Sequence, residues 1–147
     1  MKIRRLNKKD IEKLLELSEH ESFPYVIDRN TAELCCTGHN PNHPTIQTYG
    51  VFIDDNKLVS IMTATYSYIF PKDNNKSGRI VTLSGAFTLP DHRYVSYATK
   101  LIKTIESDAK EFFKAEIMYC DSNSDGLFVK TGFKYVPHNE SRLMKLL

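Results

Sequence analysis

A predicted strand that runs directly into a long amphipathic helix is the feature that most constrains this chain. Residues 80–89 are rich in β-branched and aromatic side chains and end at Pro90, which is typical of a buried strand. Over residues 94–113, apolar side chains recur at helical spacing and polar side chains occupy the other positions. Residues 115–120 then predict another buried strand. Such a strand–helix–strand unit places its two strands parallel in one sheet, with a right-handed crossover.

The segments on either side predict antiparallel strands and further helices. Strands are expected at residues 2–6, 49–53, 58–70, 133–136 and 142–147, and helices at residues 8–20, 28–37 and 121–130. Asn7 is expected to cap the first of these helices, with Asp10 three residues on as its partner. Loops rich in Pro, Gly, Asn and Asp separate them. The predicted fold class is therefore α/β, with a single mixed, mostly antiparallel sheet, helices on both faces and one central β-α-β crossover.

Length and charge narrow the classes of function. The 147 residues suit one domain spanning residues 1–147. The chain has 20 Lys and Arg and 18 Asp and Glu, and it contains no run of five or six like charges. Nucleic acid is therefore not expected as a partner. No apolar run approaches the ~20 residues that cross a bilayer, and no signal peptide is recognisable. An odd cysteine count, with Cys35 next to Cys36, argues against a disulfide framework, so a cytoplasmic location is expected.

The junction between the central strand and the long helix is a candidate anion site. The first turn of a helix exposes backbone N–H groups that have no partner within the helix, and the helix dipole favours negative charge there. Ser96 and Ala98 are small, so a phosphate or pyrophosphate can approach the backbone closely. The same pattern also occurs in α/β proteins that bind nothing at this turn. The junction alone leaves both interpretations open.

The segment from Phe87 to Ala98 resembles motif A of the GNAT superfamily of N-acetyltransferases. The usual form of that motif is Leu-x-Val-x-Pro-x-x-Arg followed by Gly-x-Gly-x-Gly or Gly-x-Gly-x-Ala. Here Pro90, Arg93 and Ala98 match, whereas Tyr94 and Ser96 replace the usual glycines. Residues 127–133, Leu-Phe-Val-Lys-Thr-Gly-Phe, look like the family's Leu-Tyr-x-Lys-x-Gly-Phe. The order of the predicted elements fits that family over nearly the whole chain.

The resemblance implies that acetyl-CoA is the co-substrate and that no metal takes part. In GNAT enzymes two parallel strands splay apart, and the pantetheine arm pairs with the strand that precedes the pyrophosphate turn. A backbone N–H near residues 87–89 would polarise the thioester carbonyl, and the acceptor amine would attack directly. The residues expected to bind the cofactor are Phe87, Thr88, Leu89, Arg93, Tyr94, Val95, Ser96, Tyr97, Ala98, Thr99 and Phe128.

Proton transfer is the weak point of the resemblance. Members of the family usually have a tyrosine near the leaving thiolate, where it acts as general acid. The matching residue here is Phe128, whose side chain cannot donate a proton. Tyr119 and Tyr97 are alternative donors. Solvent is another source of the proton, and a domain with little or no activity is the remaining interpretation.

The general base is equally open. The strand at residues 80–88 carries no carboxylate, so Ser84 is expected to hold a water that relays the proton. Asp121, at the end of the next strand, is the other candidate, although capping the helix that follows would also explain it.

The function expected from these observations is transfer of an acetyl group from acetyl-CoA to a primary amine of a small molecule, an amino acid or a peptide. A CoA-binding module without transfer activity, or an α/β interaction domain that binds no nucleotide, are the alternatives. Cys35, Cys36, His39 and His43 lie close together in the sequence, but their spacing is not that of a zinc site. We expect their loop to shape the acceptor pocket. A homodimer is left open.

Overall fold

The computed structural model describes residues 1–38, 45–71, 75–93, 96–121, 125–137 and 139–147. The strands are β1 (Lys2–Arg5), β2 (Thr45–Ile53), β3 (Lys57–Tyr68), β4 (Arg79–Thr88), β5 (Ile117–Asp121), β6 (Lys134–Val136) and β7 (Asn139–Leu146). The α-helices are α1 (Ile11–Ser18), α2 (Arg29–Thr37), α3 (Tyr97–Asp108) and α4 (Asp125–Lys130). Short 3-10 turns lie at Lys8–Asp10 and Pro90–His92, and a π-helical turn at Ala109–Phe113 extends α3.

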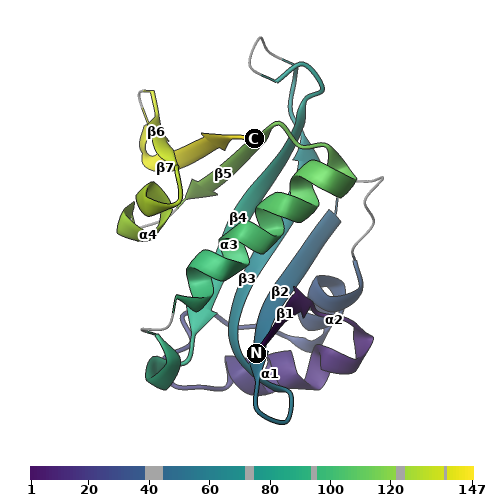
Figure 1. The fold of residues 1–147 in the computed structure, drawn as a ribbon. Coiled ribbons are helices and arrows are strands. Elements are labelled where there is room, and N and C mark those ends of the chain that lie inside the picture. The colour runs from purple at the N-terminus through teal and green to yellow at the C-terminus, as the bar shows by residue number, and fades with distance from the viewer. Residues whose placement is uncertain (39–44, 72–74, 94–95, 122–124, 138) are drawn as a thin grey trace.

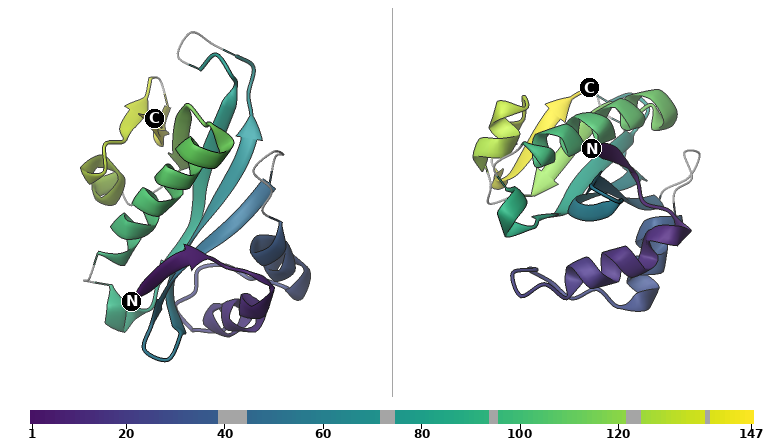
Figure 2. Two further views of the ribbon diagram at one scale, coloured as in Figure 1. Left: turned by 45° about the vertical axis from the view of Figure 1, so that its right-hand side comes forward. Right: turned by 60° about the horizontal axis from the view of Figure 1, so that its bottom comes forward.

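All seven strands form one sheet in the order β1-β2-β3-β4-β5-β7-β6 (Figure 1). Neighbouring strands are antiparallel except β4 and β5, which α3 connects and which run parallel. Helices α1 and α2 cover one face of the sheet, and α3 and α4 lie on the other (Figure 2). The predicted fold class is therefore confirmed, including the single crossover at the centre of the sheet.

Local sequence signals place the first helix correctly. Asn7 accepts a hydrogen bond from the backbone N–H of Lys9, and the Asp10 carboxylate accepts one from the N–H of Asn7 at 2.8 Å. These reciprocal bonds form the capping box that the Asn7 and Asp10 spacing predicts. The guanidinium of Arg4 also donates twice to Asp10, at 2.6 and 3.0 Å, which ties the end of β1 to the start of α1.

The central helix begins three residues later than the periodicity indicates. Ser96 is its N-cap and has a φ of 61°, in the left-handed region. Its carbonyl accepts the first helical hydrogen bond, from the N–H of Lys100 at 3.2 Å. Leu101, Ile102 and Ile105 are fully buried against the sheet. At the other end, the Tyr49 hydroxyl donates to Asp108 at 2.7 Å, and this bond anchors α3 to β2.

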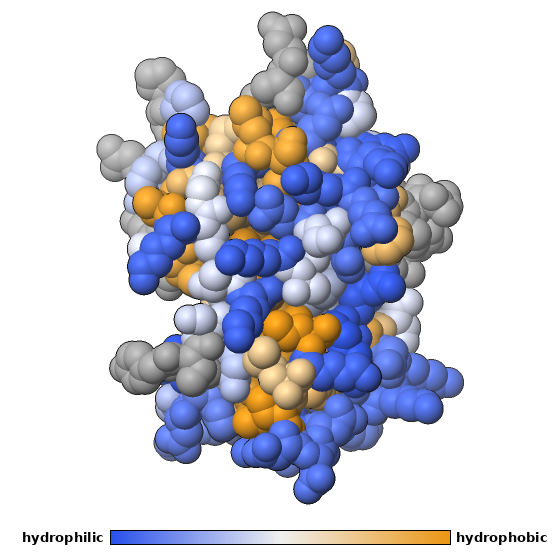
Figure 3. All heavy atoms as spheres, viewed as in Figure 1, coloured by the Kyte–Doolittle hydropathy of each residue, from blue (hydrophilic) through white to orange (hydrophobic). Residues whose placement is uncertain are grey.

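The face of the molecule seen in Figure 1 carries both hydrophilic and apolar residues. On the face seen in Figure 1, apolar residues form separate patches among hydrophilic ones (Figure 3). Among the described residues, no helix has both the length and the apolar character that crossing a membrane requires.

Candidate active site

The pairing between the parallel strands β4 and β5 ends halfway along β4. β4 and β5 pair from Ile80 with Ile117 to Leu83 with Cys120, and β5 ends one residue later. β4 continues to Thr88 and stays paired with β3 on its other side. Within the described part of the chain, residues 84–88 therefore have no strand beside them where β5 would otherwise lie. Two of their carbonyls accept side-chain hydrogen bonds, Gly85 from the Tyr25 hydroxyl and Thr88 from Arg93 Nε. An extended ligand could pair with other backbone groups along this side of β4.

A β-bulge marks the point of separation. Thr63 of β3 faces Ser84, but the next paired residues are Ile61 and Phe87, so Gly85 and Ala86 both lie opposite Met62. Gly85 has a φ of +61°, a conformation that glycine adopts at little cost and that other residues rarely take. A Cβ at this position would lie only 2.8 Å from the hydroxyl of Tyr25. The glycine is therefore required by the backbone and by its neighbour.

A cavity of about 440 Å³ opens where the strands separate. Its walls come from β3, β4, β5, α4 and the connection between α1 and α2. The lining residues are Pro24, Tyr25, Met62, Leu83, Ser84, Gly85, Ala86, Cys120, Asp121, Leu127 and Phe128. We call this cavity the splay cavity. It brings together two of the three expected catalytic residues, Ser84 and Asp121.

The third expected catalytic residue lies elsewhere. Tyr119 does not line the splay cavity, and its ring packs beneath the guanidinium of Arg142, 4.1 Å from the ring centroid. Arg142 also lies 3.7 Å from the Asp121 carboxylate, which is 63% exposed at the mouth of the cavity. Among the described residues that line this cavity, Asp121 is the one that carries a carboxylate.

A second cavity, of about 280 Å³, lies at the start of α3. It is lined by Thr88, Arg93, Ser96, Tyr97, Ala98, Thr99, Leu127 and Lys130, and we call it the helix-start cavity. Leu127 lines both cavities, so they adjoin along α4. The Ser96 side chain makes no capping hydrogen bond, which leaves the first N–H groups of α3 without that partner. Arg93 and Lys130 add two positive charges suited to an anion.

The expected cofactor residues divide into three groups. Thr88, Arg93, Ser96, Tyr97, Ala98 and Thr99 line the helix-start cavity, and Phe128 lines the splay cavity. The Phe87 side chain packs in the cluster beneath α1 and α2, so its backbone is the part that can reach a ligand in the gap beside β4. Leu89 packs against that cluster and also against the main core on the α3 side. Tyr94 and Val95 lie outside the described residues.

Lys130 and Tyr25 line these cavities with polar side chains and were not among the expected site residues. Lys130 lies within the second quoted motif, and that position was the signal for it. Tyr25 belongs to a connection with no periodic pattern, so nothing in the sequence indicated it. Its hydroxyl donates to the Gly85 carbonyl at 2.8 Å. Burial, and to a lesser extent neighbouring Cys35, raises the pKa of Tyr25 to about 12, so the hydroxyl stays protonated at neutral pH.

Phe128 has the environment of a core residue as well as a place in the splay cavity. It is 3% exposed and makes an edge-on contact with Phe133, with ring centroids 5.4 Å apart. No hydroxyl is present at the position where the resembling family carries one. Tyr97, the other expected donor, lines the helix-start cavity rather than the splay cavity.

The metal interpretation gains no support from the described residues. Cys35 and Cys36 are buried in α2 as free thiols. His39 and His43 lie outside the described residues. In the described part of the chain, no group of three or more metal-ligating side chains comes together.

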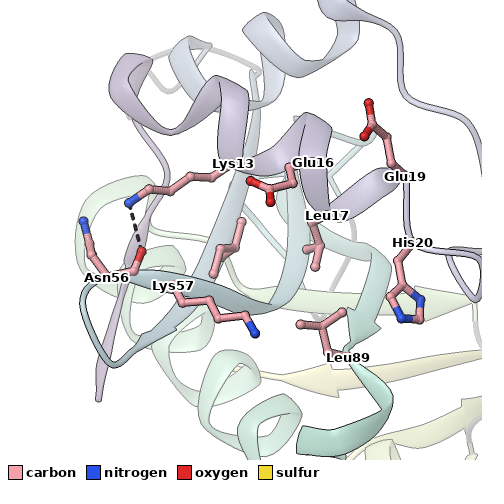
Figure 4. Close-up of a pocket in the computed structure, with 9 residues that line it drawn as sticks. Lys13, Glu16, Leu17, Glu19, His20, Asn56, Lys57 and Leu89 are labelled. Carbon is pink, nitrogen blue, oxygen red and sulfur yellow. Dashed lines mark hydrogen bonds between the residues drawn. The ribbon is translucent and has the colours of Figure 1, made fainter.

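A third cavity, of about 440 Å³, lies between α1 and the turn joining β2 to β3 (Figure 4). Leu17, Leu58 and Leu89 line it together with charged side chains of both signs, and Lys13 donates to the Asn56 carbonyl at its edge. It shares no lining residue with the other two cavities. It is therefore separate from the gap between β4 and β5.

Comparison with known proteins identifies the fold. No protein-family model matches the chain, and no curated protein matches it. Arabidopsis thaliana NAA60 in complex with acetyl-CoA superposes with a TM-score of 0.75 at 13% identity, over 99% of this chain and 98% of that one. The GNAT domain of S. lividans PAT gives 0.72 at 15% identity, over 99% and 89%. An acetyltransferase of the GNAT family from Staphylococcus aureus gives 0.69 at 16% identity, over 99% and 98%. The chain therefore has the fold of the GNAT acetyltransferases over nearly its whole length.

Proposed function

We propose that this protein is an N-acetyltransferase that moves the acetyl group of acetyl-CoA to a primary amine of a small molecule, an amino acid or a peptide. The proposal rests on the early end of the β4–β5 pairing. Between the splay cavity and the start of α3, residues 84–88 of β4 have no described strand on that side. NAA60, which shares the fold, has been solved with acetyl-CoA and with a bisubstrate analogue.

The helix-start cavity suits the diphosphate of CoA. The N–H groups of Tyr97, Ala98 and Thr99 open the helix there, and the positive end of the dipole adds to them. Arg93 and Lys130 neutralise charge at the rim. The Arg93 side chain is held in place by a hydrogen bond of 3.0 Å from its Nε to the Thr88 carbonyl.

The pantetheine arm would run from that site along residues 84–88, in the place that a paired strand would occupy. This path ends at the splay cavity, so the thioester would lie near the bulge at Gly85. Backbone N–H groups at a bulge lack ladder partners and can polarise a thioester carbonyl.

Asp121 and Ser84 supply the polar side chains for the acceptor. An amine is protonated at neutral pH, so it must lose a proton before its nitrogen can attack. The Asp121 carboxylate at the cavity mouth attracts the ammonium, and Ser84 on β4 can hold a water that carries the proton away. The C–N bond then forms as the C–S bond breaks. The nitrogen gives up a second proton to water, solvent protonates the leaving thiolate, and the products are an amide and the CoA thiol.

A CoA-binding module with little or no transferase activity is the second candidate, and Phe128 favours it. The residue is buried in the splay cavity and offers no proton to a leaving thiolate. Under this candidate the binding site is the same, but the reaction does not proceed.

Two measurements on the purified chain test both candidates. Thermal unfolding is followed as CoA is added, with ADP as a matched ligand that carries the diphosphate but no pantetheine. A ligand at 100 times its Kd stabilises a protein by about 2.7 kcal/mol, and CoA should act at lower concentration than ADP. Thiol release from acetyl-CoA is then measured with a panel of primary amines.

The outcomes separate the candidates. Stabilisation by CoA with amine-dependent thiol release supports the transferase. Stabilisation without thiol release for any amine supports the binding module. No stabilisation by CoA contradicts both. The single domain, the cytoplasmic location, the homodimer and the absence of metal and nucleic acid stay predictions.

A further inference from the structure

The hydroxyl of Tyr25 bridges two parts of the chain that are 60 residues apart. It belongs to the connection between α1 and α2 and donates to the carbonyl of Gly85, in the bulge of β4, at 2.8 Å. It also lines the splay cavity. The proposed mechanism gives this contact no role.

Gly85 is the residue of the bulge whose peptide group can turn over most easily. The Gly85–Ala86 peptide turns through ψ of Gly85 and φ of Ala86. Glycine has no Cβ to restrict its ψ, so its backbone alone does not fix the direction of the Gly85 carbonyl. In a planar peptide, the carbonyl of Gly85 and the N–H of Ala86 point in opposite directions. Whatever holds the carbonyl therefore also fixes the direction of that N–H.

This direction matters for the proposed chemistry. Acyl transfer develops negative charge on the thioester oxygen, which N–H groups stabilise and carbonyl oxygens repel. At the splay, the backbone of β4 has no β5 ladder to hold its peptide groups in register. A hydrogen bond from a side chain is the constraint that the structure provides there.

The aromatic side chains around Tyr25 keep its hydroxyl in place. Its ring packs against Phe23 with centroids 4.5 Å apart, and Phe23 packs against Phe87 at 4.8 Å. Phe87 belongs to β4 and lies two residues beyond Gly85. The connection is thus attached to the same strand that its hydroxyl holds. The raised pKa of Tyr25 keeps the hydroxyl a donor throughout the neutral range.

We infer that Tyr25 is a positioning residue for acetyl transfer: its hydrogen bond to the Gly85 carbonyl fixes the Gly85–Ala86 peptide at the splay and keeps that carbonyl away from the reacting thioester. The inference rests on the proposed function. Tyr25 acts through the backbone of β4 and needs no contact with the acetyl group.

The test uses Tyr25→Phe, which keeps the ring and its packing and removes only the hydroxyl. Gly85–Ala86 is the one Gly-Ala pair in the sequence. Labelling glycine with ¹³C at the carbonyl and alanine with ¹⁵N therefore gives a single amide correlation that reports this peptide. Tyr68→Phe is the matched control, because Tyr68 is half-exposed at the far end of β3.

The correlation should move in Tyr25→Phe and stay in place in Tyr68→Phe. In thiol release with an amine that the wild-type chain accepts, kcat should fall about tenfold or more, a smaller loss than removal of a direct oxyanion donor causes. The KM for acetyl-CoA and the thermal shift with CoA should stay within about twofold, because a positioning role changes kcat rather than ground-state binding.

Each contrary result has a separate meaning. The positioning role alone is overturned if the correlation in Tyr25→Phe does not move or if kcat does not change. A raised KM for the amine with kcat unchanged overturns it as well. A wild-type chain that releases no thiol with any amine overturns the proposed function and the positioning role together. A large loss of CoA stabilisation in Tyr25→Phe would show a structural role instead.

Discussion

Placing a carboxylate at the start of α3 should stabilise the free protein and weaken its binding to CoA. Ser96 is the exposed N-cap of that helix, and its side chain makes no capping hydrogen bond. Ser96→Asp therefore adds a negative charge without removing a recorded side-chain interaction. The φ of 61° is tolerated by aspartate better than by most residues.

The two effects have opposite signs and different sizes. A negative charge at a helix N-terminus is worth about 0.3–1 kcal/mol, which in a domain of this size raises Tm by about 1–4 °C. The same carboxylate would face a diphosphate carrying about two negative charges. At ~5 Å in a water-like dielectric each pair of charges costs about 0.8 kcal/mol. The sum of about 1.7 kcal/mol corresponds to a roughly 20-fold higher Kd.

The assay is thermal unfolding with and without CoA, at low and high salt. Raising the salt to 1 M shortens the screening length to about 3 Å, so the loss of affinity should shrink. Ser107→Asp is the matched control, because it makes the same substitution at an exposed position near the other end of α3. It should gain no stability and keep its CoA affinity. If Ser96→Asp raises Tm but binds CoA as tightly as the wild type, the diphosphate does not lie at the start of α3.

Three further predictions concern stability and the missing proton donor. Tyr49→Phe should lower the free energy of unfolding in urea by about 1–3 kcal/mol, because it removes a buried hydroxyl that anchors Asp108 of α3. Asp10→Ala should cost about 2–3 kcal/mol at pH 7 through its pairing with Arg4. Burial raises the pKa of Asp10, but the hydrogen bonds from Arg4 and Asn7 lower it by more, so the pKa in the folded protein is below its usual value. The stability that ionised Asp10 contributes is therefore present above about pH 4. It is lost as the pH falls from there through the lowered folded-state pKa. In urea titrations the advantage of the wild type over Asp10→Ala should therefore be full at pH 7 and smaller at about pH 2. Phe128→Tyr should raise kcat for thiol release if proton donation limits the reaction, and an unchanged kcat would contradict that view.

Features that depend on neighbouring residues were predictable from the sequence. The capping box at Asn7 and Asp10 and the buried face of α3 are both confirmed. They follow from spacings within a few residues, where side chains and backbone interact directly. The parallel direction of β4 and β5 was also predicted, because a strand–helix–strand unit returns the chain to the same sheet in the same direction.

Features that depend on distant segments were not predictable. The pairing of β4 with β5 ends after Leu83. The GNAT resemblance implied such a separation of the strands, but no local pattern in β4 indicates where it begins. The Tyr25 hydroxyl reaches Gly85 across the fold from an aperiodic connection. The left-handed Ser96 is intermediate: glycine at the equivalent position of the resembling motif indicated an unusual backbone, although serine itself did not.

The short parallel ladder between β4 and β5 also has a mechanical consequence. Four residue pairs join β1–β4 to the group formed by β5, β7 and β6, whereas β2 and β3 share nine. This short ladder, which we call the seam, divides the sheet into two parts, β1–β4 and β5–β7. The amides of its four pairs should exchange hydrogen with solvent sooner than those of the β2–β3 ladder. A ligand lying lengthwise between the two parts would act as an extra strand and slow that exchange. Transient opening of the seam would then let the ligand enter, and the bound ligand would hold the two parts of the sheet together.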